Sequence, residues 1–576
     1  MIRLGTRGSA LALRQSGFVA ERLRAGGLAV ELVTIATRGD ASDRPFRELE
    51  GKAFFTKELD EALESRAIDL AIHSLKDLPT DDPDGLVTLP VLPRADPRDL
   101  LLARRGVRPA SSDGATRDGE LRLPRGARVG TSSARRFAQL LHACPGIDVV
   151  DLRGNVPTRV EKLRRGDYDA IVLAAAGLER LALDLSDLDV VPLDPPRFLP
   201  APGQGVLAAR LRAGEPELAA AVAALVDRDA RDAAEAERAL LARLDGGCSL
   251  PLGALARREG QEIVLHACLA RELEEGRREL RHVTARGPDG ETAAALAAAQ
   301  LLQQPIVLLT RPSGLDASLL AHLREQRLPH LSQPAIDFVE RPTDGALVAT
   351  LVAARAASDT IDAFDVIAFT SQRAVQSWFH HLRAARVAEH HLARRAPRYA
   401  AIGPATAAAL AAHGAATSLV GDGSGGRAFA QLLAAELPRG ARVLHPGPLE
   451  PEGTLARELD ARGFAVTALP LYATVALDDD PELPDAPLVV LLSSPSAARA
   501  FLARPRVAAR LAAAPASLRF VAGGATTAVQ LAALQVRDVV TAALPTGAPL
   551  LAALATALAA ARAPALVSNL ETPCPR

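Results

Sequence analysis

Cysteine is scarce in this chain, and so are aromatic residues. The cysteines are Cys144, Cys248, Cys268 and Cys574, and no two of them form a C-x-x-C pair. So few cysteines exclude a disulfide scaffold and agree with a reducing compartment. The aromatic residues are 14 Phe, 3 Tyr and 1 Trp, which leaves little material for stacking nucleobases.

The chain also lacks an excess of either charge and a long hydrophobic run. Lys and Arg together number 67 against 68 Asp and Glu, a net charge of -1, so we expect no nucleic-acid partner and no membrane partner. The first residues lack the ~7–15-residue apolar core of a signal peptide. The apolar stretch 550–560 is shorter than the ~20 residues that span a bilayer. A soluble, cytoplasmic, monomeric protein is expected.

The length and the hydrophobic pattern predict several α/β domains. At 576 residues the chain is too long for one hydrophobic core, which stops growing near ~250–300 residues. Short apolar runs alternate with amphipathic stretches, the pattern of α/β units with parallel sheets. A long helix is expected over 215–244, followed by a small α+β piece. The alternation starts afresh at 303–305, which divides the chain into two halves.

Lysine is rare although arginine is abundant. Of the 67 basic residues, four are lysine: Lys52, Lys57, Lys76 and Lys162. Where arginine has replaced nearly every lysine, those that remain are candidates for sites that need a compact ammonium group. Three of them lie between positions 52 and 76, and chance clustering is the alternative.

Cationic and hydroxyl side chains recur where predicted strands turn into helices. The segments are Thr6-Arg-Gly-Ser9, 51–57, 73–79, 130–136, 152–159 and 176–180. Such turns lie at one edge of an α/β sheet and bind anions, so a ligand with several carboxylates or phosphates is expected. At each single position a solvated charge or a helix cap is the alternative. No phosphate-binding glycine loop and no metal-ligand spacing is present, so we expect neither a nucleotide nor a metal.

Cys248 follows Gly246 and Gly247, which allow a close approach of backbone and ligand. A cysteine beside a cationic cleft is prone to ionise. The residues alone leave two alternatives open, covalent attachment of a group and an inert thiol.

The second half contains two pairs of segments that echo each other. Residues 367–372 resemble 490–495, and residues 402–406 resemble 522–526. In each, an apolar strand ends in small hydroxyl or glycine residues that open a helix. The pattern favours an internal duplication, and coincidence among α/β units is the alternative.

Seven ordered motifs in residues 1–303 resemble the hydroxymethylbilane synthase family, also called porphobilinogen deaminase. They are Thr6-Arg-Gly-Ser9, Gly51-Lys…Lys57-Glu-Leu, His73-Ser-Leu-Lys-Asp-Leu-Pro79, Gly130-Thr-Ser-Ser-Ala-Arg-Arg136, Leu152-Arg-Gly-Asn155, Pro202-Gly-Gln-Gly205 and Gly246-Gly-Cys248. The resemblance implies a dipyrromethane cofactor in thioether linkage to Cys248. It also implies the stepwise addition of four porphobilinogen units with loss of ammonia, and release of hydroxymethylbilane by hydrolysis.

The same resemblance implies roles for single residues. Asp77 is the implied catalytic carboxylate. The implied cofactor-binding residues are Cys248, Lys76, Ser133, Arg135 and Arg136. The implied substrate-binding residues are Arg7, Ser9, Lys52, Lys57, Arg153, Arg159 and Arg180. Each pyrrole unit brings two carboxylates, which agrees with a cation-rich cleft.

Residues 305–576 resemble uroporphyrinogen-III synthase. The motifs are Leu309-Thr-Arg-Pro312, Phe369-Thr-Ser371, Ile402-Gly-Pro-Ala-Thr406, Leu471-Tyr-Ala-Thr474, Leu492-Ser-Ser-Pro-Ser496 and Gly523-Gly-Ala-Thr-Thr527. The resemblance implies closure of hydroxymethylbilane to uroporphyrinogen III with inversion of the last pyrrole. It implies Tyr472 as the catalytic position, and a cleft between two lobes lined by Ser371, Thr406, Ser494 and Thr527.

The implied fold is α/β: two doubly wound, periplasmic-binding-protein-like lobes, a small α+β domain, and then a two-lobed α/β half. The expected domains are 1–99 with 199–214, 100–198, 215–303, 305–338 with 474–576, and 339–473. One alternative is a deaminase whose C-terminal half is inactive or regulatory. Another is a two-lobe solute-binding module, which would need an export signal but not Cys248. A nucleic-acid-binding regulator is disfavoured by charge and composition.

Overall fold

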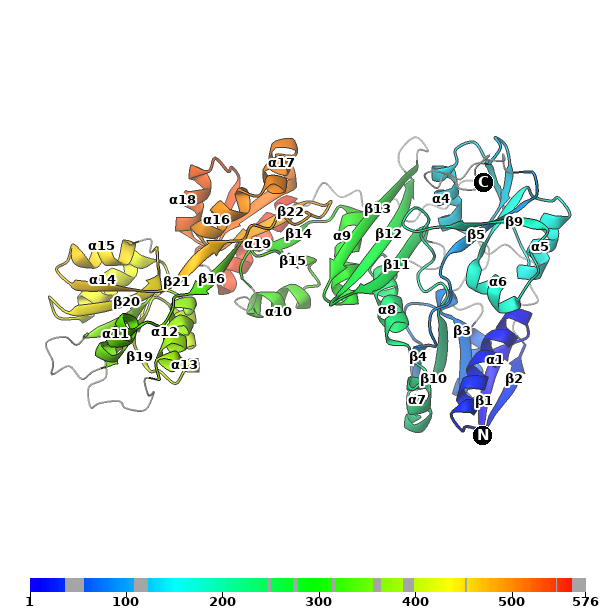
Figure 1. Ribbon diagram of the computed structural model, residues 1–576, viewed down its shortest axis with the longest axis horizontal. Helices are drawn as coiled ribbons and strands as arrows, with labels where there is room; N and C mark the ends of the chain where they lie inside the picture. The colour runs from blue at the N-terminus through cyan, green and yellow to red at the C-terminus, as the bar shows by residue number, and fades with distance from the viewer. Residues whose placement is uncertain are drawn as a thin grey trace. The chain divides into compact units, whose positions relative to one another are not determined.

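The computed structural model describes residues 1–36, 56–107, 123–245, 250–272, 278–312, 317–355, 364–386, 398–450, 453–544 and 546–561. The chain divides into two compact units, Met1–Gln304 and Pro305–Arg576, the first and the second unit below (Figure 1). Every sheet takes all its strands from one unit. The finer domain limits expected from the sequence stay predictions.

The first unit begins with a five-stranded sheet in the order β2-β1-β3-β10-β4. Its strands are β1 (Ile2–Arg7), β2 (Val30–Ile35), β3 (Leu70–Ser74), β4 (Leu86–Val91) and β10 (Leu207–Arg212). β1 runs parallel to β2 and β3. Buried Leu4 and Leu70 of this sheet belong to one core with Val19 and Leu23 of α1 (Ala10–Ala25).

A second five-stranded sheet follows in the order β7-β6-β8-β5-β9. Its strands are β5 (Asp99–Arg104), β6 (Arg128–Gly130), β7 (Asp148–Val150), β8 (Ala170–Ala174) and β9 (Leu188–Leu193). β5 is antiparallel to β8 and β9, and β10 is antiparallel to β3 and β4. Both sheets of the first unit are therefore mixed, with parallel pairing among β1, β2 and β3 in one and among β6, β7 and β8 in the other. The chain enters β5 and β10 by crossing over from the other sheet. Each therefore pairs antiparallel with its neighbours, without the crossover helix that parallel pairing of consecutive strands requires.

Three helices of the first unit begin directly after parallel strands. Helices α1, α4 (Ala134–Ala143) and α5 (Val156–Arg164) follow β1, β6 and β7. Their cap residues are Ser9, Ser133 and Asn155, and each side-chain oxygen accepts a hydrogen bond from the backbone N–H three residues later. Such caps satisfy the N–H groups that a helix leaves unpaired at its start. They fix the turns that carry the predicted site residues.

The small α+β part is an antiparallel sheet with two helices. Its strands β11 (Leu252–Glu259), β12 (Glu262–Glu272) and β13 (Arg278–Gly287) pair in sequence order. Helices α8 (Arg228–Arg243) and α9 (Gly290–Leu302) contact this sheet and each other.

The single helix expected over 215–244 is two helices, α7 (Pro216–Ala223) and α8. Asp227 has an extended backbone, and its carboxylate accepts a hydrogen bond from the N–H of Ala230 at 2.8 Å. This cap starts a new helix where the sequence pattern indicated continuity.

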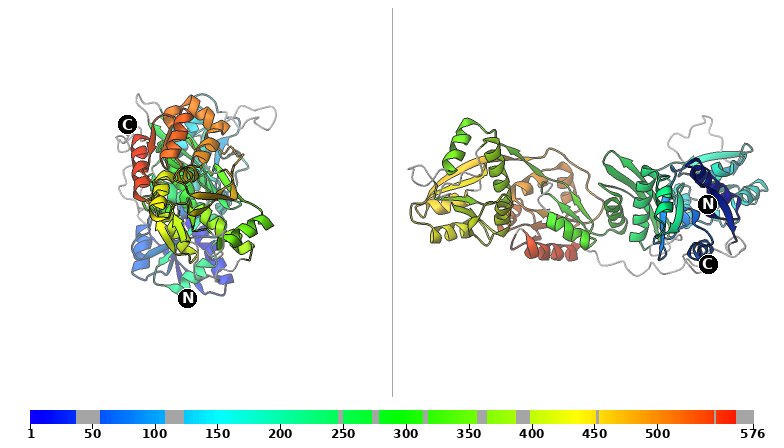
Figure 2. Two further views of the ribbon diagram at one scale, coloured as in Figure 1. Left: turned by 90° about the vertical axis from the view of Figure 1, so that its left-hand side faces the viewer. Right: turned by 90° about the horizontal axis from the view of Figure 1, so that it is seen from below.

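The second unit contains a five-stranded parallel sheet in the order β15-β14-β22-β23-β24. Its strands are β14 (Ile306–Leu309), β15 (His330–Ser332), β22 (Leu488–Leu492), β23 (Leu518–Ala522) and β24 (Val539–Thr541). Its helices include α10 (Ala317–Glu325), α16 (Pro495–Leu502), α17 (Pro505–Ala513), α18 (Ala525–Ala533) and α19 (Gly547–Ala561). Helix α19, red in Figures 1 and 2, packs its buried Leu and Ala side chains on β22 and β23.

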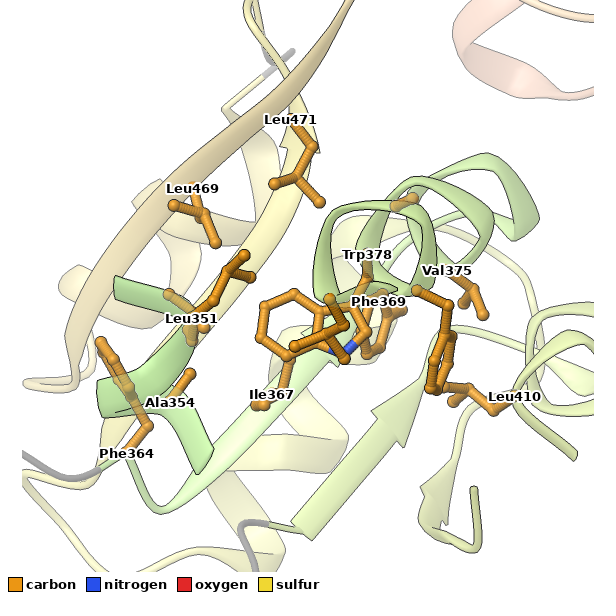
Figure 3. Packing of buried hydrophobic residues seen from close by; sticks show 14 of the residues in the cluster. Leu351, Ala354, Phe364, Ile367, Phe369, Val375, Trp378, Leu410, Leu469 and Leu471 are labelled. Atoms are coloured by element: carbon orange, nitrogen blue, oxygen red, sulfur yellow. The ribbon is translucent and has the colours of Figure 1, made fainter. Parts of the chain in front are cut away.

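A six-stranded sheet completes the second unit, in the order β16-β21-β20-β17-β18-β19. Its strands are β16 (Ile336–Glu340), β17 (Val366–Phe369), β18 (Arg398–Ala401), β19 (Thr417–Val420), β20 (Arg442–Pro448) and β21 (Ala465–Ala476). Its helices include α11 (Gly345–Arg355), α12 (Gln372–Ala384), α13 (Pro404–Ala412), α14 (Gly426–Glu436) and α15 (Thr454–Asp460). Figure 3 shows Trp378 of α12 among Ile367, Phe369 and Leu351, and all four are fully buried.

Two connections join the sheets of the second unit, and they lie side by side. β16 pairs antiparallel with β21, and Ile336 faces Ala476 at the end of the ladder. The buried Arg504 donates to the carbonyl of Pro334 and to Asp479 at 2.6 Å each, so it ties both connections together. Within the described residues, none of the helices has the length and apolarity of a membrane span. The described part of the chain also holds no cluster of His, Cys, Asp and Glu suited to a metal ion.

Candidate functional site

Arg7 and Ser9 lie at the carboxyl end of β1, as expected. Arg7 ends the strand and is half-buried, and Ser9 caps α1. Lys57 opens helix α3 (Lys57–Glu64), is exposed, and lies with its Nζ 3.8 Å from Oε1 of Glu61. Lys52 lies outside the described residues.

Lys76 and Asp77 share one short turn of 3-10 helix, Leu75–Asp77, directly after β3. Lys76 is half-buried, and its Nζ makes a long hydrogen bond of 3.5 Å to Oε1 of Gln204. Burial lowers the pKa of Lys76, while the neighbouring Asp77 carboxylate raises it. Asp77 itself is exposed, so its carboxylate is accessible to solvent.

The twin arginines of α4 converge on one buried carboxylate. Oδ2 of Asp99 accepts from Nη1 of Arg135 at 2.7 Å, and Oδ1 accepts from Nη2 of Arg136 at 2.8 Å. Burial by itself would raise the pKa of Asp99, but the charges and hydrogen bonds of both arginines hold it below its ordinary value. The Nε–H groups of Arg135 and Arg136 are buried without a hydrogen-bond partner. Two donors therefore remain to be satisfied beside this ion-pair cluster.

Arg153 and Arg159 flank the start of α5. Nη2 of Arg153 pairs with the exposed Asp151 at 2.7 Å. Nε of Arg159 donates to the carbonyl of Gly154 at 2.6 Å. Burial lowers the pKa of Arg159, and the charge of Arg136 lowers it further, so these two cations lie close enough to repel.

Arg180 lies on α6 (Ala175–Leu181) and is half-buried. Its Nη2 donates to the carbonyl of Gly205 at 2.8 Å, and burial lowers its pKa. The side chain borders a cavity of about 370 Å³ that Phe18 and Arg22 of α1 also line. Arg180 thus bridges α6 to the segment that leads into β10.

Asp99 and Gln204 complete this cluster, although sequence reasoning assigned neither of them a role. Nε2 of Gln204 donates to Oδ1 of Asp99 at 2.9 Å and to the carbonyl of Pro97 at 2.7 Å. Gln204 therefore connects Lys76 to the twin arginines. The motif Pro202-Gly-Gln-Gly205 was a sequence signal for Gln204, whereas Asp99 carried none.

The hydroxyl residues of the second unit form two matching pairs. Ser371 and Thr406 follow the adjacent parallel strands β17 and β18, and Ser494 and Thr527 follow β22 and β23. Ser371 and Ser494 are half-buried caps of α12 and α16, each accepting from the backbone N–H three residues later, at 3.1 and 3.2 Å. Thr406 and Thr527 are buried within the first turns of α13 and α18. The two pairs of similar sequence segments therefore correspond to equivalent strand ends in two different sheets.

Tyr472 lies in β21 with its ring buried. The ring of Phe338 meets it edge to face at 5.5 Å, and the guanidinium of Arg373 lies 5.5 Å from its centroid. Burial raises the pKa of Tyr472, while a hydrogen bond with Ser371 and the charge of Arg373 lower it. Tyr472 and Ser371 are therefore brought together, as a shared role requires.

A second layer of polar groups supports Tyr472, and sequence reasoning missed it. Glu340, the cross-strand partner of Tyr472, accepts from Nη2 of Arg373 at 2.6 Å and from the hydroxyl of Ser377. The buried His381 lies with Nε2 3.2 Å from the same carboxylate. Glu340 is far from Arg373, Ser377 and His381 in the sequence, so no local signal indicated this cluster.

The first unit matches two parts of one enzyme family. Residues 2–220 match the family model "Porphobilinogen deaminase, dipyromethane cofactor binding domain", and residues 232–303 match "Porphobilinogen deaminase, C-terminal domain". A porphobilinogen deaminase of Roseiflexus castenholzii is 47% identical over 272 residues, which cover 46% of this chain and 85% of that protein. The chain belongs to the porphobilinogen deaminase family.

Other members of the porphobilinogen deaminase family give the same picture. The enzyme of Rubrobacter xylanophilus is 48% identical over 263 residues, 46% of this chain and 82% of its own length. That of Mycobacterium tuberculosis is 47% identical over 279 residues, 47% of this chain and 86% of its own length. Each of these matches covers 46–47% of the chain. The first unit, which holds the matched family domains, is here named the deaminase half.

The second unit, here named the synthase half, matches another family. Residues 317–552 match the model "Uroporphyrinogen-III synthase HemD", so the chain joins a deaminase to a uroporphyrinogen-III synthase domain. Solved structures similar to it include a Thermus thermophilus uroporphyrinogen III synthase, 18% identical, covering 44% of this chain and 98% of that chain with a TM-score of 0.32. The Helicobacter pylori uroporphyrinogen-III synthetase is 15% identical, covering 44% and 99%, with a TM-score of 0.29.

The donor set of the deaminase half fits a dipyrromethane cofactor. Two pyrrole units carry four carboxylates. The cluster offers them the ammonium group of Lys76 and the buried Nε–H groups of Arg135 and Arg136, which have no hydrogen-bond partner among the described residues. Guanidinium and ammonium donors are suited to carboxylates. Cys248, the expected attachment point, lies outside the described residues. Cys144 and Cys268 are both buried free thiols, and burial raises the pKa of Cys268 to about 12, so neither suits that role.

Proposed function

We propose that this chain carries out two consecutive steps of tetrapyrrole synthesis. The deaminase half joins four porphobilinogen molecules into hydroxymethylbilane with release of ammonia. The synthase half then closes this product to uroporphyrinogen III with inversion of the last ring. The observation that carries the proposal is the presence of both family matches in one chain, each within a separate compact unit.

In the first step, Asp77 stabilises the positive charge that forms at pyrrole nitrogen. When bound, the cofactor supplies the pyrrole chain end to which new units are added, held through Cys248. Loss of ammonia from porphobilinogen leaves a cation, and a fixed carboxylate lowers the energy of that charge as it develops. Asp77 suits this role because it is exposed at a strand end, whereas Asp99 is buried and committed to two arginines.

The surrounding cations bind the substrate carboxylates. Arg7, Lys57, Arg153 and Arg159 each lie at or beside the carboxyl end of a strand or the start of a helix. Ser9 and Ser133 cap two of these helices, and they add hydroxyl groups to the backbone donors there. Lys52 and Arg180 complete the set proposed for carboxylate recognition. Several cations serve this purpose because each added pyrrole brings two further carboxylates.

In the second step, the synthase half acts mainly by positioning. Ring closure without help joins the chain ends in their existing order, so inversion requires a bent geometry that brings the wrong carbon into reach. Ser371, Thr406, Ser494 and Thr527 at the strand ends, with the Tyr472 hydroxyl, are proposed to hold that geometry. This assignment is supported by the contact of Ser371, which follows the end of β17, with Tyr472 of β21, two strands away in the same sheet.

The test is the isomer that the intact chain makes from porphobilinogen alone. Liquid chromatography of the oxidised products separates type I from type III. Predominantly type III supports both activities. Type I with normal ammonia release would show that the synthase half is inactive, which is the alternative function.

The proposal includes a monomeric, cytoplasmic enzyme without a nucleic-acid partner. Size-exclusion chromatography with light scattering tests the monomer against the 60.3 kDa expected for one chain.

A further inference from the structure

A small cavity lies beside the carboxyl end of β20 in the six-stranded sheet. Its volume is about 150 Å³, and it is lined by His445 with residues 447–449 and 468–470. Of these, His445 is the one titratable side chain, and the others are glycine, proline, alanine and leucine. This cavity, named the slot below, therefore offers a ligand one imidazole ring beside the backbone groups of its lining.

His445 is fixed in this slot by its neighbours. It is only 7% exposed, and its Nε2 lies 3.1 Å from the hydroxyl oxygen of Thr370. Burial lowers the pKa of His445 to about 4, so the imidazole is neutral near pH 7. A neutral imidazole has one donor and one acceptor nitrogen. When Nε2–H donates to Thr370, Nδ1 is the acceptor.

The slot adjoins the groups already assigned to the synthase reaction. Thr370 directly precedes Ser371, which is hydrogen-bonded to Tyr472. His445 and Tyr472 lie on the neighbouring strands β20 and β21. All of these residues lie at or near one edge of the sheet, where α/β folds bind ligands.

The dimensions and chemistry of the slot match one pyrrole ring. Pockets for whole drug-sized ligands measure ~300–1,000 Å³, so a cavity half that size takes only a part of a linear tetrapyrrole. A carboxylate would find no cation in the lining. The ring of a pyrrole unit is flat and has a single N–H donor, which requires an acceptor when it is buried. The two carboxylates that each unit carries would stay outside the slot.

We infer that this cavity binds one pyrrole ring of the linear tetrapyrrole and that His445 accepts the hydrogen bond of that ring's N–H. The inference rests on the proposed function of the synthase half. The terminal C–O bond breaks and the hydroxyl leaves as water with a proton taken from solvent, which leaves positive charge on pyrrole nitrogen. An acceptor there stabilises the cation more than the neutral ring, which is the condition for raising the rate.

Two variants of His445 test the hydrogen bond in the full-length enzyme supplied with hydroxymethylbilane. Hydrogen bonds to charged groups are strong enough that His445→Leu should lower kcat/KM of ring closure by about ten- to a hundredfold. The fraction of type I isomer should rise accordingly. His445→Gln retains an acceptor and should stay within about threefold of wild type. If the glutamine variant is as impaired as the leucine variant, the acceptor role is wrong.

A matched control removes another histidine of the same part of the fold. His413 stacks on Phe379 at 4.3 Å and does not line the cavity. His413→Leu should leave the isomer ratio unchanged. Emission from Trp378, the single tryptophan of the chain, reports whether each variant keeps the packed core around α12.

A second substitution tests the slot without touching His445. Ala468 lines the cavity and is exposed, so Ala468→Leu fills the space without disturbing the core. This variant should raise KM for hydroxymethylbilane and the type I fraction. If folded His445→Leu and Ala468→Leu both keep wild-type kinetics, the inference is overturned and the proposed function stands. If the wild-type chain itself makes only type I, the proposed function fails and this inference fails with it.

Discussion

Asp99 holds together a buried cluster of charged groups in the deaminase half. It is 4% exposed and accepts hydrogen bonds from Arg135, Arg136 and Gln204. Removing one partner of a buried ion pair leaves the others uncompensated in a medium that solvates charge poorly. The loss of folding free energy is therefore much larger than for an ion pair that is exposed to water.

We therefore predict that Asp99→Asn destabilises the deaminase half by about 3–5 kcal/mol. Calorimetry of the full chain should show the lowered transition. Asp151→Asn is the matched control, because it breaks the exposed pair with Arg153 and should cost only ~0–1 kcal/mol. Equal shifts in the two variants would contradict the structural role of Asp99.

The stability difference between wild type and Asp99→Asn should also depend on pH. The folded chain holds the pKa of Asp99 below its ordinary value. Its contribution is therefore fully present above the pKa of the unfolded carboxyl, about 3.9, and is lost as the pH falls toward the folded value. The difference should be constant between about pH 6 and 8 and should narrow below about pH 4.

Asp77 is predicted to matter for rate and not for stability. It is exposed, so Asp77→Asn should leave thermal unfolding unchanged. Loss of a charge placed against a developing cation typically costs on the order of 10²–10³ in rate. Ammonia release from porphobilinogen measures the effect, and near-wild-type turnover would exclude the proposed role.

Cys248→Ser should remove the attachment point of the cofactor. A serine hydroxyl is a far weaker nucleophile than a cysteine thiolate. Intact-mass spectrometry of the wild type should find two linked pyrroles beyond the sequence mass, and the variant should lack them. Persistence of the added mass in Cys248→Ser would assign the linkage to another residue.

For single residues, the sequence predicts the motifs of the site but not the residues that pair with them in space. Arg135 and Arg136 stand out in the sequence because they follow hydroxyl residues at a helix start. Asp99 does not, because its burial depends on α4 and on Gln204, which are far away in the chain. Local composition carries no information on such long-range packing. The site assignments themselves stay predictions until the variants are measured.

At the scale of elements, the two serine caps of the synthase half are near copies. Ser371 has φ −159° and ψ 156°, and Ser494 has φ −150° and ψ 158°. Both precede helices that follow a central parallel strand. They differ in their further partners, since Ser371 also contacts Tyr472, whereas the hydroxyl oxygen of Ser494 lies 3.1 Å from that of Ser496.

We predict that Ser371→Ala and Ser494→Ala each cost ~0.5–2 kcal/mol, the usual effect of losing a cap. Only Ser371→Ala should raise the pKa of Tyr472 further, because the lost hydrogen bond lowers that pKa. Ultraviolet titration of the 3 tyrosines distinguishes the two variants. An identical titration curve for both would mean that the Tyr472 contact is not formed in solution.

Parallel strands and capped helices were predictable, and the crossing strands were not. β1 and β6 are followed by helices with the side-chain caps Ser9 and Ser133, and the segments of β3 and β8 are short apolar runs. β5 and β10 pair with strands that are distant in the sequence, so no turn between neighbouring strands marks them in the local pattern. Their pairing is fixed by sheets that form from distant parts of the chain.

At the scale of the whole molecule, the two halves share no sheet. The alternation restarts at 303–305, and the compact units divide between Gln304 and Pro305. A change of hydrophobic pattern over many residues is a strong local signal, which explains why this boundary is visible in the sequence.

A chain ending at Gln304 should consume porphobilinogen at a similar rate and yield the type I isomer. Separately expressed 305–576 should restore type III when it is added back. The reason is that each half contains complete sheets and cores of its own. If the shortened chain still makes type III, ring inversion does not belong to the synthase half.

The strand order of the five-stranded sheet in the synthase half also bears on how the chain is made. β14 lies between β15 and β22, and β22 begins only at Leu488. About 180 residues separate β14 from β22, and a ribosome that adds ~5–20 residues per second needs roughly 10–35 s to synthesise them. During that time one edge of the fully apolar β14 has no native partner. The nascent synthase half therefore passes through a period of exposure to misassembly, while the deaminase half has already left the exit tunnel complete.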